Sequence, residues 1–375
     1  MTRWYKTVRI ILGAALIGLM VSLALAAESG PLTPETVDGI VKPIMEKARI
    51  PGLSIAISSA DGRTLERSYG TSNLEHQIPV TRESIFEIGS LTKTFTALAI
   101  LLLEEEGKLR VDDKLSKYFP GFRGGEEITL RHLLQHTSGI KEILQVEPFG
   151  TNQEKDWRPQ EVVKMLESLP LDFEPGQRAQ YNNSGCMLLG LVIEKVSGVA
   201  YGDFLAERIV KPLGMMHTQI GRNDAVIRNR VTGYELNTAT GSMRNAKYTS
   251  LVSPYASGGL LSTPADLIKL KKALRPGALL KPASLEAMFA PVRLNNGQKF
   301  EQPGTGMTFG YCLELLKFGE QVVPGKTGGI SGFNAYFAYL PQWDFMVAVT
   351  GNLQNSLGAL IEISGAILKI ELNRQ

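Results

Sequence analysis

Cysteine and histidine are scarce in this sequence, with two cysteines and four histidines among 375 residues. Cys186 and Cys312 lie far apart, and neither belongs to a Cys-x-x-Cys pair, so the spacing typical of dithiol redox enzymes is absent. An exported protein can oxidise its thiols. The sequence leaves open whether these two meet, although their apolar surroundings favour buried free thiols.

The four histidines form no convincing metal site. His132 and His136 have the i, i+4 spacing of metal ligands on a helix, but no Glu lies between them as in a zinc protease helix. The other two, His76 and His217, stand alone in the sequence. We therefore expect structural roles for His132 and His136, and neither a metal nor another cofactor.

Other absences narrow the class of protein. The chain has no internal repeat and no low-complexity tract, and its content of 43% hydrophobic and 21% charged residues is ordinary for a globular domain. It also has no Gly-x-Ser-x-Gly segment, which excludes the nucleophile elbow of α/β-hydrolases.

Charge is missing from a long stretch near the start of the chain. Three basic residues precede an uncharged run from Ile10 to Ala27, which closes with Ala24-Leu25-Ala26. This order is typical of a secretory signal peptide, so we predict that residues 1–26 are removed and that residues 27–375 are periplasmic or secreted. The alternative is an uncleaved anchor, and only then would the protein contact a membrane.

The net charge of +3 belongs to that segment. Residues 1–26 hold three basic and no acidic groups, so +3 less 3 leaves the mature chain at 0. A neutral protein has no general electrostatic attraction for nucleic acid, and we expect a small-molecule or peptide substrate instead.

Strand patterns lie near both ends of the chain and helical patterns fill the middle. The expected strands are Gly52–Ser58 and Thr64–Tyr69, which flank an Asp61-Gly62 turn, and Tyr311–Leu316, Gln321–Pro324, Tyr336–Leu340 and Phe345–Thr350. The expected helices are Thr33–Ala48, 91–106, 129–139, Pro159–Leu169, Gly185–Val196, Asp203–Ile209, Pro264–Leu274 and Leu357–Leu372.

This distribution predicts an α+β fold. One antiparallel sheet would use about residues 27–120 and 300–375, flanked by the two terminal helices, and a helical subdomain would use about residues 121–299. A cleft between the two parts is the natural place for a site.

The segment Ser90-Leu91-Thr92-Lys93 begins a mostly apolar helix and is the candidate nucleophilic site. Positions i and i+3 are neighbours on a helix, so Lys93 lies beside the Ser90 hydroxyl. Burial lowers the pKa of a lysine, and a neutral amine activates a serine. A second copy, Ser138-Gly139-Ile140-Lys141, has a glycine inside it and begins where a helix is expected to end, so we discount it.

Two further segments occur once each. In Tyr181-Asn182-Asn183, we expect Tyr181 to shuttle protons with a pKa lowered by nearby ammonium groups, and Asn183 to bind a substrate amide. In Lys326-Thr327-Gly328, we expect Lys326 and Thr327 to hold a substrate carboxylate. The bare backbone at Gly328 and Gly329 lets a substrate approach, and the Gly329 amide pairs with that of Ser90 as an oxyanion hole.

With these motifs in this order, the chain resembles the serine β-lactamase-like family, which contains class C β-lactamases, low-molecular-weight D-alanyl-D-alanine peptidases and related esterases. The resemblance extends over about residues 50–350. Further similar segments are Thr129–Ile140, Pro212–Met215, Ala256–Leu260, Ser262–Asp266 and Gly328–Phe333. The family implies an acyl-enzyme on Ser90, helped by Lys93 and Tyr181, that water hydrolyses.

Departures from individual branches leave the substrate open. Gly233 stands where class A β-lactamases carry a catalytic Glu, which argues against that mechanism. The His136-Thr-Ser-Gly139 segment is typical of esterases and peptidases, whereas Lys326 is often replaced in esterases. β-Lactams, D-amino-acid peptides and small esters all remain as possible substrates, as does the alternative of a sensor module that is acylated without turnover.

The polar loop from Lys141 to Arg158 either borders the cleft or is a surface connection. The oligomeric state also stays open.

Overall fold

A computed structural model describes residues 32–237, 239–318 and 321–374. The predicted signal peptide, residues 1–26, lies outside these ranges. Within them, no single helix is long and apolar enough to cross a membrane. One bent pair of helices, Asn183–Ser197 with Tyr201–Leu213, is together long and apolar enough, by length and composition only.

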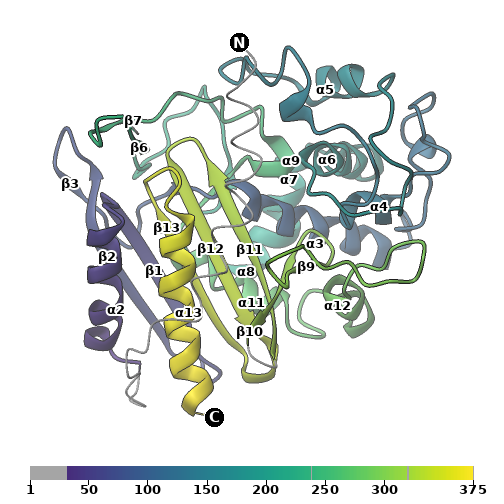
Figure 1. Ribbon diagram of the computed structural model, residues 1–375. Coiled ribbons are helices and arrows are strands. Elements are labelled where there is room, and N and C mark those ends of the chain that lie inside the picture. Colours follow the sequence, from purple (N-terminus) through teal and green to yellow (C-terminus); the bar gives the residue numbers. More distant parts are fainter. Residues whose placement is uncertain (1–31, 238, 319–320, 375) are drawn as a thin grey trace.

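The main sheet is antiparallel and is built from both ends of the chain (Figure 1). Its eight strands follow the order β3-β2-β1-β13-β12-β11-β10-β9. The strands are β1 (Gly52–Ser58), β2 (Thr64–Asn73), β3 (Ile78–Pro79), β9 (Thr308–Phe309), β10 (Glu314–Phe318), β11 (Gln321–Ile330), β12 (Phe333–Leu340) and β13 (Phe345–Gly351). Strand β1 pairs with β13, with Leu53 opposite Gly351, and this pairing joins the two ends. The predicted α+β architecture is confirmed.

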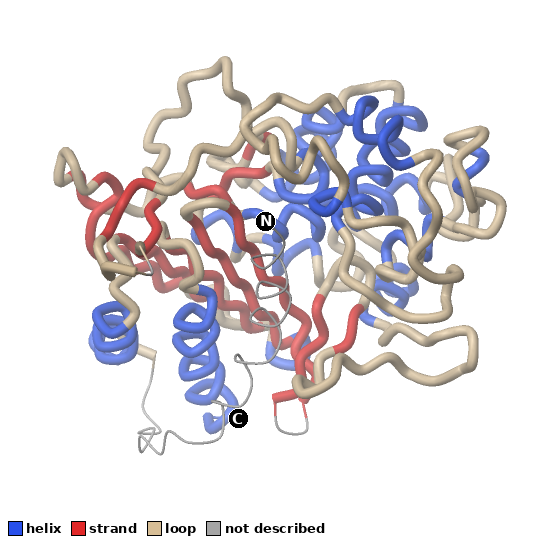
Figure 2. Tube along the Cα trace, turned by 45° about the horizontal axis from the view of Figure 1, so that its top comes forward, coloured by secondary structure: helices blue, strands red, loops and turns tan. Residues whose placement is uncertain are grey.

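Side chains alternate between two cores across this sheet, because successive residues of a strand point to opposite faces. On β13, Phe345, Val347 and Val349 pack with the terminal helices α2 (Pro34–Lys47) and α13 (Leu357–Arg374). Met346 and Ala348 of the same strand pack with the helical region. Figure 2 shows the sheet lying between the two terminal helices and that region.

The prediction of a short strand ending at Pro324 is wrong, because β11 continues to Ile330 and contains Lys326-Thr327-Gly328. The strand stays paired with β12 from Gly325 opposite Ala338 onward. Glycines normally weaken a strand, but here they allow a close approach. A Cβ on Gly325 would lie 2.6 Å from the carbonyl oxygen of Phe337.

The helical region surrounds α3 (Thr92–Glu105), of which all residues from Thr92 to Leu103 are buried, as its apolar sequence predicts. The other helices are α4 (Leu130–Leu134), α5 (Pro159–Leu166), α6 (Asn183–Ser197), α7 (Tyr201–Leu205), α8 (Lys211–Leu213), α9 (Tyr255–Gly258), α10 (Pro264–Leu267), α11 (Leu270–Ala273) and α12 (Pro282–Phe289). Short turns of other helix types are η1 (Gly89–Leu91), η2 (Leu115–Lys117), η3 (Ile143–Gln145), η4 (Ala206–Val210) and η5 (Pro341–Trp343).

Several helix predictions are wrong in extent. The helix expected over Pro159–Leu169 ends at Leu166, and the one expected over Asp203–Ile209 is divided between α7 and η4. The helix expected to reach Gly139 ends at Leu134, because His136 has a positive φ of 59° and leaves the helical conformation. The helix expected over Pro264–Leu274 is divided into α10 and α11.

Short strands also occur outside the main sheet, and all of them except β4 lie inside the region expected to be helical. They form a three-stranded sheet in the order β4-β8-β5 and the hairpin β6-β7. Their bounds are β4 (Phe86–Glu87), β5 (Gln219–Ile220), β6 (Tyr234–Leu236), β7 (Met243–Asn245) and β8 (Leu260–Ser262). Strands of two or three residues are too short to show an alternating pattern in the sequence.

The two cysteines meet in the core that surrounds α3. Cys186 on α6 and Cys312 before β10 are both buried free thiols, and their Sγ atoms lie 3.6 Å apart. A disulfide would need about 2.05 Å. The expectation of buried free thiols is therefore confirmed, and their proximity is a result of the tertiary fold.

Candidate active site

Ser90 lies in η1 at the entry to α3, and its side chain is partly exposed. The turn is held on both sides. The Thr92 hydroxyl donates a hydrogen bond of 2.7 Å to the Gly89 carbonyl, and the Ile88 amide donates one of 3.1 Å to the Leu260 carbonyl. Gly89 has a φ of 50° and lies against the backbone of Gly329, where an added Cβ would be 2.9 Å from an oxygen. The serine therefore stands on a rigid corner beside β11.

Lys93 is fully buried one helical turn after Ser90. Its Nζ lies 3.2 Å from Ser90 Oγ, 2.7 Å from Asn183 Oδ1 and 2.6 Å from the Ser257 carbonyl oxygen. Burial lowers the pKa of Lys93 to about 8. A neutral amine has two hydrogens, which the amide and carbonyl oxygens accept, so its lone pair is left for the Ser90 hydroxyl.

Tyr181 completes the set around the serine. Its hydroxyl donates a hydrogen bond of 2.6 Å to Ser90 Oγ. The Nζ atoms of Lys93 and Lys326 each lie 4.9 Å from the centroid of its ring. The prediction of a lowered pKa is wrong, since burial raises the pKa of Tyr181 well above its ordinary value. The negative charges of Glu314 and Glu142 add to this rise, and the hydrogen bond with Ser90 opposes it without cancelling it. Tyr181 is therefore a protonated phenol at neutral pH.

A neutral histidine supports that phenol. The rings of His136 and Tyr181 lie 4.8 Å apart, and His136 Nδ1 accepts a hydrogen bond of 3.3 Å from the Asn182 amide. Burial lowers the pKa of His136 well below its usual range. His132 caps α4 instead, with its Nδ1 accepting from the Thr129 amide. Both histidines thus have the structural contacts that we expected.

Asn183 is held by a residue that the sequence analysis did not single out. Its backbone amide donates 2.6 Å to Glu142 Oε2, and its Nδ2 donates 2.9 Å to Glu142 Oε1. This pairing fixes the amide so that Oδ1 faces Lys93. The side chain of Asn183 therefore faces the lysine and the glutamate, while its predicted contact with a substrate amide stays a prediction.

Lys326 and Thr327 share one carboxylate, that of Glu314 on β10. The Lys326 ammonium forms a buried ion pair with Glu314, and its side chain is only 1% exposed. The Thr327 hydroxyl donates 2.7 Å to Glu314 Oε1, and the Thr327 amide donates 3.0 Å to Glu314 Oε2. The Glu314 carboxylate therefore already binds the ammonium and the hydroxyl that we expected to hold a substrate carboxylate.

The glycines of the motif bring β11 against the serine turn. A Cβ on Gly328 would lie 2.1 Å from the Ile88 carbonyl oxygen, so only glycine fits there. Gly329 is exposed, and an added Cβ would meet only Asn334 Nδ2, at 3.1 Å. The structure therefore brings Gly329 and Ser90 to the same corner, which is the arrangement that the oxyanion-hole prediction requires.

The second Ser-x-x-Lys segment has no such geometry. Gly139 has a φ of 74°, the Ser138 hydroxyl accepts from the Ile140 amide at 3.3 Å, and Lys141 pairs with Asp172. The two side chains therefore have separate partners, as expected.

Three residues at the site escaped the sequence analysis: Glu142, Ser257 and Glu314. Glu314 is the one acidic residue in an otherwise apolar strand segment, a signal that could have drawn attention to it. Glu142 belongs to the loop that was left as either cleft border or surface connection, and its contact with Asn183 places the start of that loop at the site. Ser257 contributes a backbone oxygen, for which side-chain identity is no guide.

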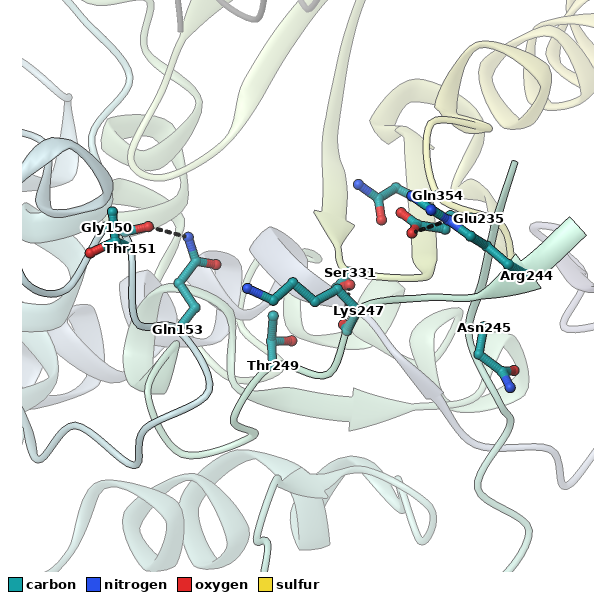
Figure 3. A pocket seen from close by; sticks show the side chains of 10 residues that line it. All are labelled: Gly150, Thr151, Gln153, Glu235, Arg244, Asn245, Lys247, Thr249, Ser331 and Gln354. Carbon is teal, nitrogen blue, oxygen red and sulfur yellow. Dashed lines mark hydrogen bonds and ion pairs between the residues drawn. The ribbon is translucent and has the colours of Figure 1, made fainter. Parts of the chain in front are cut away.

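A polar cavity of about 630 Å³ lies beside the turn that follows β11. Its lining comprises Gly150, Thr151, Gln153, Glu235, Arg244, Asn245, Lys247, Thr249, Ser331 and Gln354. Figure 3 shows Lys247 and Ser331 between the loop at Gly150 and the Glu235–Arg244 pair. The Ser331 hydroxyl donates 2.5 Å to the Lys247 carbonyl oxygen, and this bond joins the turn to the cavity wall.

Comparison with known proteins agrees with this geometry. The family model described as Beta-lactamase matches residues 37–370. Penicillin-binding protein 4* of Bacillus subtilis (strain 168) is 32% identical over 302 residues, which are 77% of this chain and 65% of that protein. Protein flp of Staphylococcus aureus (strain MRSA252) is 27% identical over 327 residues, 86% of this chain and 63% of that protein. The chain thus spans less than two thirds of the length of these relatives.

Two solved structures are similar over nearly the whole described fold. D-amino acid amidase from Ochrobactrum anthropi SV3, complexed with L-phenylalanine amide, has a TM-score of 0.78 and 25% identity, and the match covers 90% of this chain and 97% of that one. The octameric penicillin-binding protein homologue from Pyrococcus abyssi has a TM-score of 0.77 and 29% identity, and the match covers 91% and 78% of the two chains.

Proposed function

Because this chain belongs to the Beta-lactamase family, we propose that it is an exported serine hydrolase that forms an acyl-enzyme on Ser90. One observation carries the proposal. Ser90 Oγ lies 3.2 Å from the amine of buried Lys93 and accepts a hydrogen bond of 2.6 Å from Tyr181. A hydroxyl between a base and a proton donor is the arrangement that nucleophilic catalysis requires.

In the acylation step, the neutral amine of Lys93 takes the proton of Ser90 as Oγ attacks the substrate carbonyl. The backbone amides of Ser90 and Gly329 stabilise the oxyanion, and one such donor typically contributes about 3 kcal/mol to the transition state. Tyr181 then gives its proton to the leaving group. The step ends with an acyl ester on Ser90, a protonated Lys93 and a phenolate at Tyr181.

In the deacylation step, the Tyr181 phenolate takes a proton from water, whose oxygen attacks the acyl ester. When the second tetrahedral intermediate collapses, Lys93 returns its proton to Ser90 Oγ. Every proton is thereby restored. The high pKa that burial imposes on Tyr181 suits the deacylation step, because its phenolate is a strong base once formed.

The proposed acyl donors are β-lactams, D-amino-acid peptides or amides, and small esters. The names of the similar proteins, which include penicillin-binding proteins and a D-amino acid amidase, support this range. Asn183, which contacts Lys93, is proposed to orient the acyl side chain of such a substrate.

A fluorophosphonate probe and a labelled penicillin test the nucleophile. The wild type should be labelled once, and Ser90→Ala should not be labelled. Ser138→Ala, in the second Ser-x-x-Lys segment, is the matched control and should label like the wild type. Equal labelling of the wild type and Ser90→Ala would contradict the assignment.

A substrate panel then tests turnover. Nitrocefin, a D-Ala-D-Ala peptide and p-nitrophenyl butyrate represent the three substrate classes, and at least one should be hydrolysed continuously. A stoichiometric burst with no turnover over hours on any of them would instead indicate the sensor module.

A further inference from the structure

The buried ion pair of Lys326 and Glu314 bears on the substrates that the site accepts. Lys326 is 1% exposed and the Glu314 side chain is 6% exposed, so neither charge faces solvent. They lie on adjacent strands, since Gly325 of β11 stands opposite Glu314 of β10. Two opposite charges in direct contact in the interior of a protein act on their surroundings almost as a neutral unit.

Thr327 is bound to the same anion. Both its hydroxyl, at 2.7 Å, and its backbone amide, at 3.0 Å, donate to the Glu314 carboxylate. The ammonium and the hydroxyl that would recognise a substrate carboxylate therefore already have a carboxylate partner within the protein. A substrate anion placed beside Thr327 would also lie close to Glu314, and like charges repel.

The other lysine of the site, Lys93, does not change this balance. Lys93 is fully buried, and its amine is surrounded by Ser90, Asn183 and the Ser257 carbonyl. Asn183 links Lys93 to the carboxylate of Glu142, which is itself buried. With Lys93 in the neutral form that acylation requires, the described site has no surplus positive charge for an anionic group.

From this arrangement we infer that Glu314 is a specificity-determining residue, which neutralises Lys326 and makes the site favour acyl donors whose leaving group is uncharged. The inference rests on the proposed function and narrows it to neutral esters and amides. Glu314 touches no reacting atom, so it acts through Lys326 and Thr327 as a positioning residue.

Two matched esters test this inference: 3-carbamoylphenyl acetate and 3-carboxyphenyl acetate. Their leaving groups have nearly the same shape and differ in charge. We expect the wild type to have a higher kcat/KM for the carbamoyl ester, after division by the spontaneous hydrolysis rates. In Glu314→Gln, which leaves the charge of Lys326 unpaired, the carboxyl-to-carbamoyl ratio should rise about tenfold, which corresponds to about 1.4 kcal/mol. An unchanged ratio would overturn the inference.

A double variant, Glu314→Met with Lys326→Met, covers the case in which Glu314→Gln does not fold. Replacing both partners of a buried ion pair by apolar groups of similar size is often tolerated. Because the pair is neutral in the wild type, the double variant should keep the wild-type ratio within about twofold. A tenfold fall in the ratio would show that Lys326 binds the substrate carboxylate, contrary to the inference.

Failure of the proposed function has a different signature. Hydrolysis of both esters that persists in Ser90→Ala would refute the acyl-enzyme on Ser90 and this inference with it. Hydrolysis that depends on Ser90, with a ratio that does not respond to Glu314→Gln, would refute the inference alone.

Discussion

The hydroxyl of Tyr181 lies 2.6 Å from Ser90 Oγ and donates a hydrogen bond to it. The direction of this bond has a chemical meaning. Burial raises the pKa of Tyr181 and lowers that of Lys93 to about 8, so the phenol keeps its proton while the amine readily loses one. Two groups with pKa values shifted in opposite directions on either side of a nucleophile are a natural acid and base pair.

Removing the phenol hydroxyl tests its part in that pair. We expect Tyr181→Phe to lower kcat by about 10²- to 10⁴-fold, the usual contribution of a positioned general acid or base. The loss should be smaller for p-nitrophenyl esters, whose leaving group needs no proton, than for amides. A uniform loss on both substrate types would argue that Tyr181 acts in deacylation alone.

The pKa of Lys93 predicts the pH dependence of activity. The base form of Lys93 grows as the pH rises through about 8, so kcat/KM should increase along a limb centred near pH 8 and then level off. Steady-state rates on p-nitrophenyl butyrate between pH 6 and 10 measure it. A profile that is flat over this range would exclude Lys93 as the titrating base.

The same shift predicts a pH dependence of stability. Between pH 8 and 10.5 the unfolded chain keeps the proton on Lys93 and the folded chain loses it, so the stability rises with pH. The free energy of unfolding of the wild type minus that of Lys93→Met should therefore increase from pH 8 to 10, by at most about 1.4 kcal/mol per pH unit. Urea denaturation at several pH values measures this difference, and a decrease would have the wrong sign.

Glu142 positions Asn183, and the pH profile distinguishes this role from a merely structural one. Glu142→Ala frees the Asn183 amide and should lower kcat/KM about tenfold. It also removes a negative charge that raises the pKa of Lys93, so the limb near pH 8 should move to lower pH. The exposed Glu126 offers a matched control, Glu126→Ala, for which neither change is expected. If the limb of the pH profile stays near pH 8 in Glu142→Ala, the electrostatic coupling between Glu142 and Lys93 is contradicted.

Two glycine substitutions should have opposite effects. Gly328→Ala puts a methyl group 2.1 Å from the Ile88 carbonyl, so η1 must move and the activity of Ser90 should fall more than tenfold, with lower stability. Gly39→Ala, in α2, meets no atom within 4 Å and should stabilise the fold by about 0.5–1 kcal/mol. Thermal unfolding and ester hydrolysis measure both, and a fully active Gly328→Ala would contradict the proposed packing of β11 on η1.

Local sequence patterns predicted a large part of the fold and of the site. The i, i+3 spacing of Ser90 and Lys93 depends only on the helix that the apolar run from Leu91 predicts, and that helix is present as α3. The turn at Asp61-Gly62 joins β1 and β2 as expected, because those residue types favour a hairpin. The sequence by itself therefore predicted the α+β class, the family and the two side chains, Lys93 and Tyr181, that contact Ser90 Oγ.

Only the tertiary structure decided the charge balance around those residues. A pKa depends on burial and on neighbours from other elements, so the raised value of Tyr181 could not be read from its own segment. The contacts of Glu142 with Asn183 and of Glu314 with Lys326 join residues 41 and 12 positions apart, respectively, through a loop and a strand pairing. Sequence patterns report the faces of single helices and strands, whereas such pairings depend on how those elements pack.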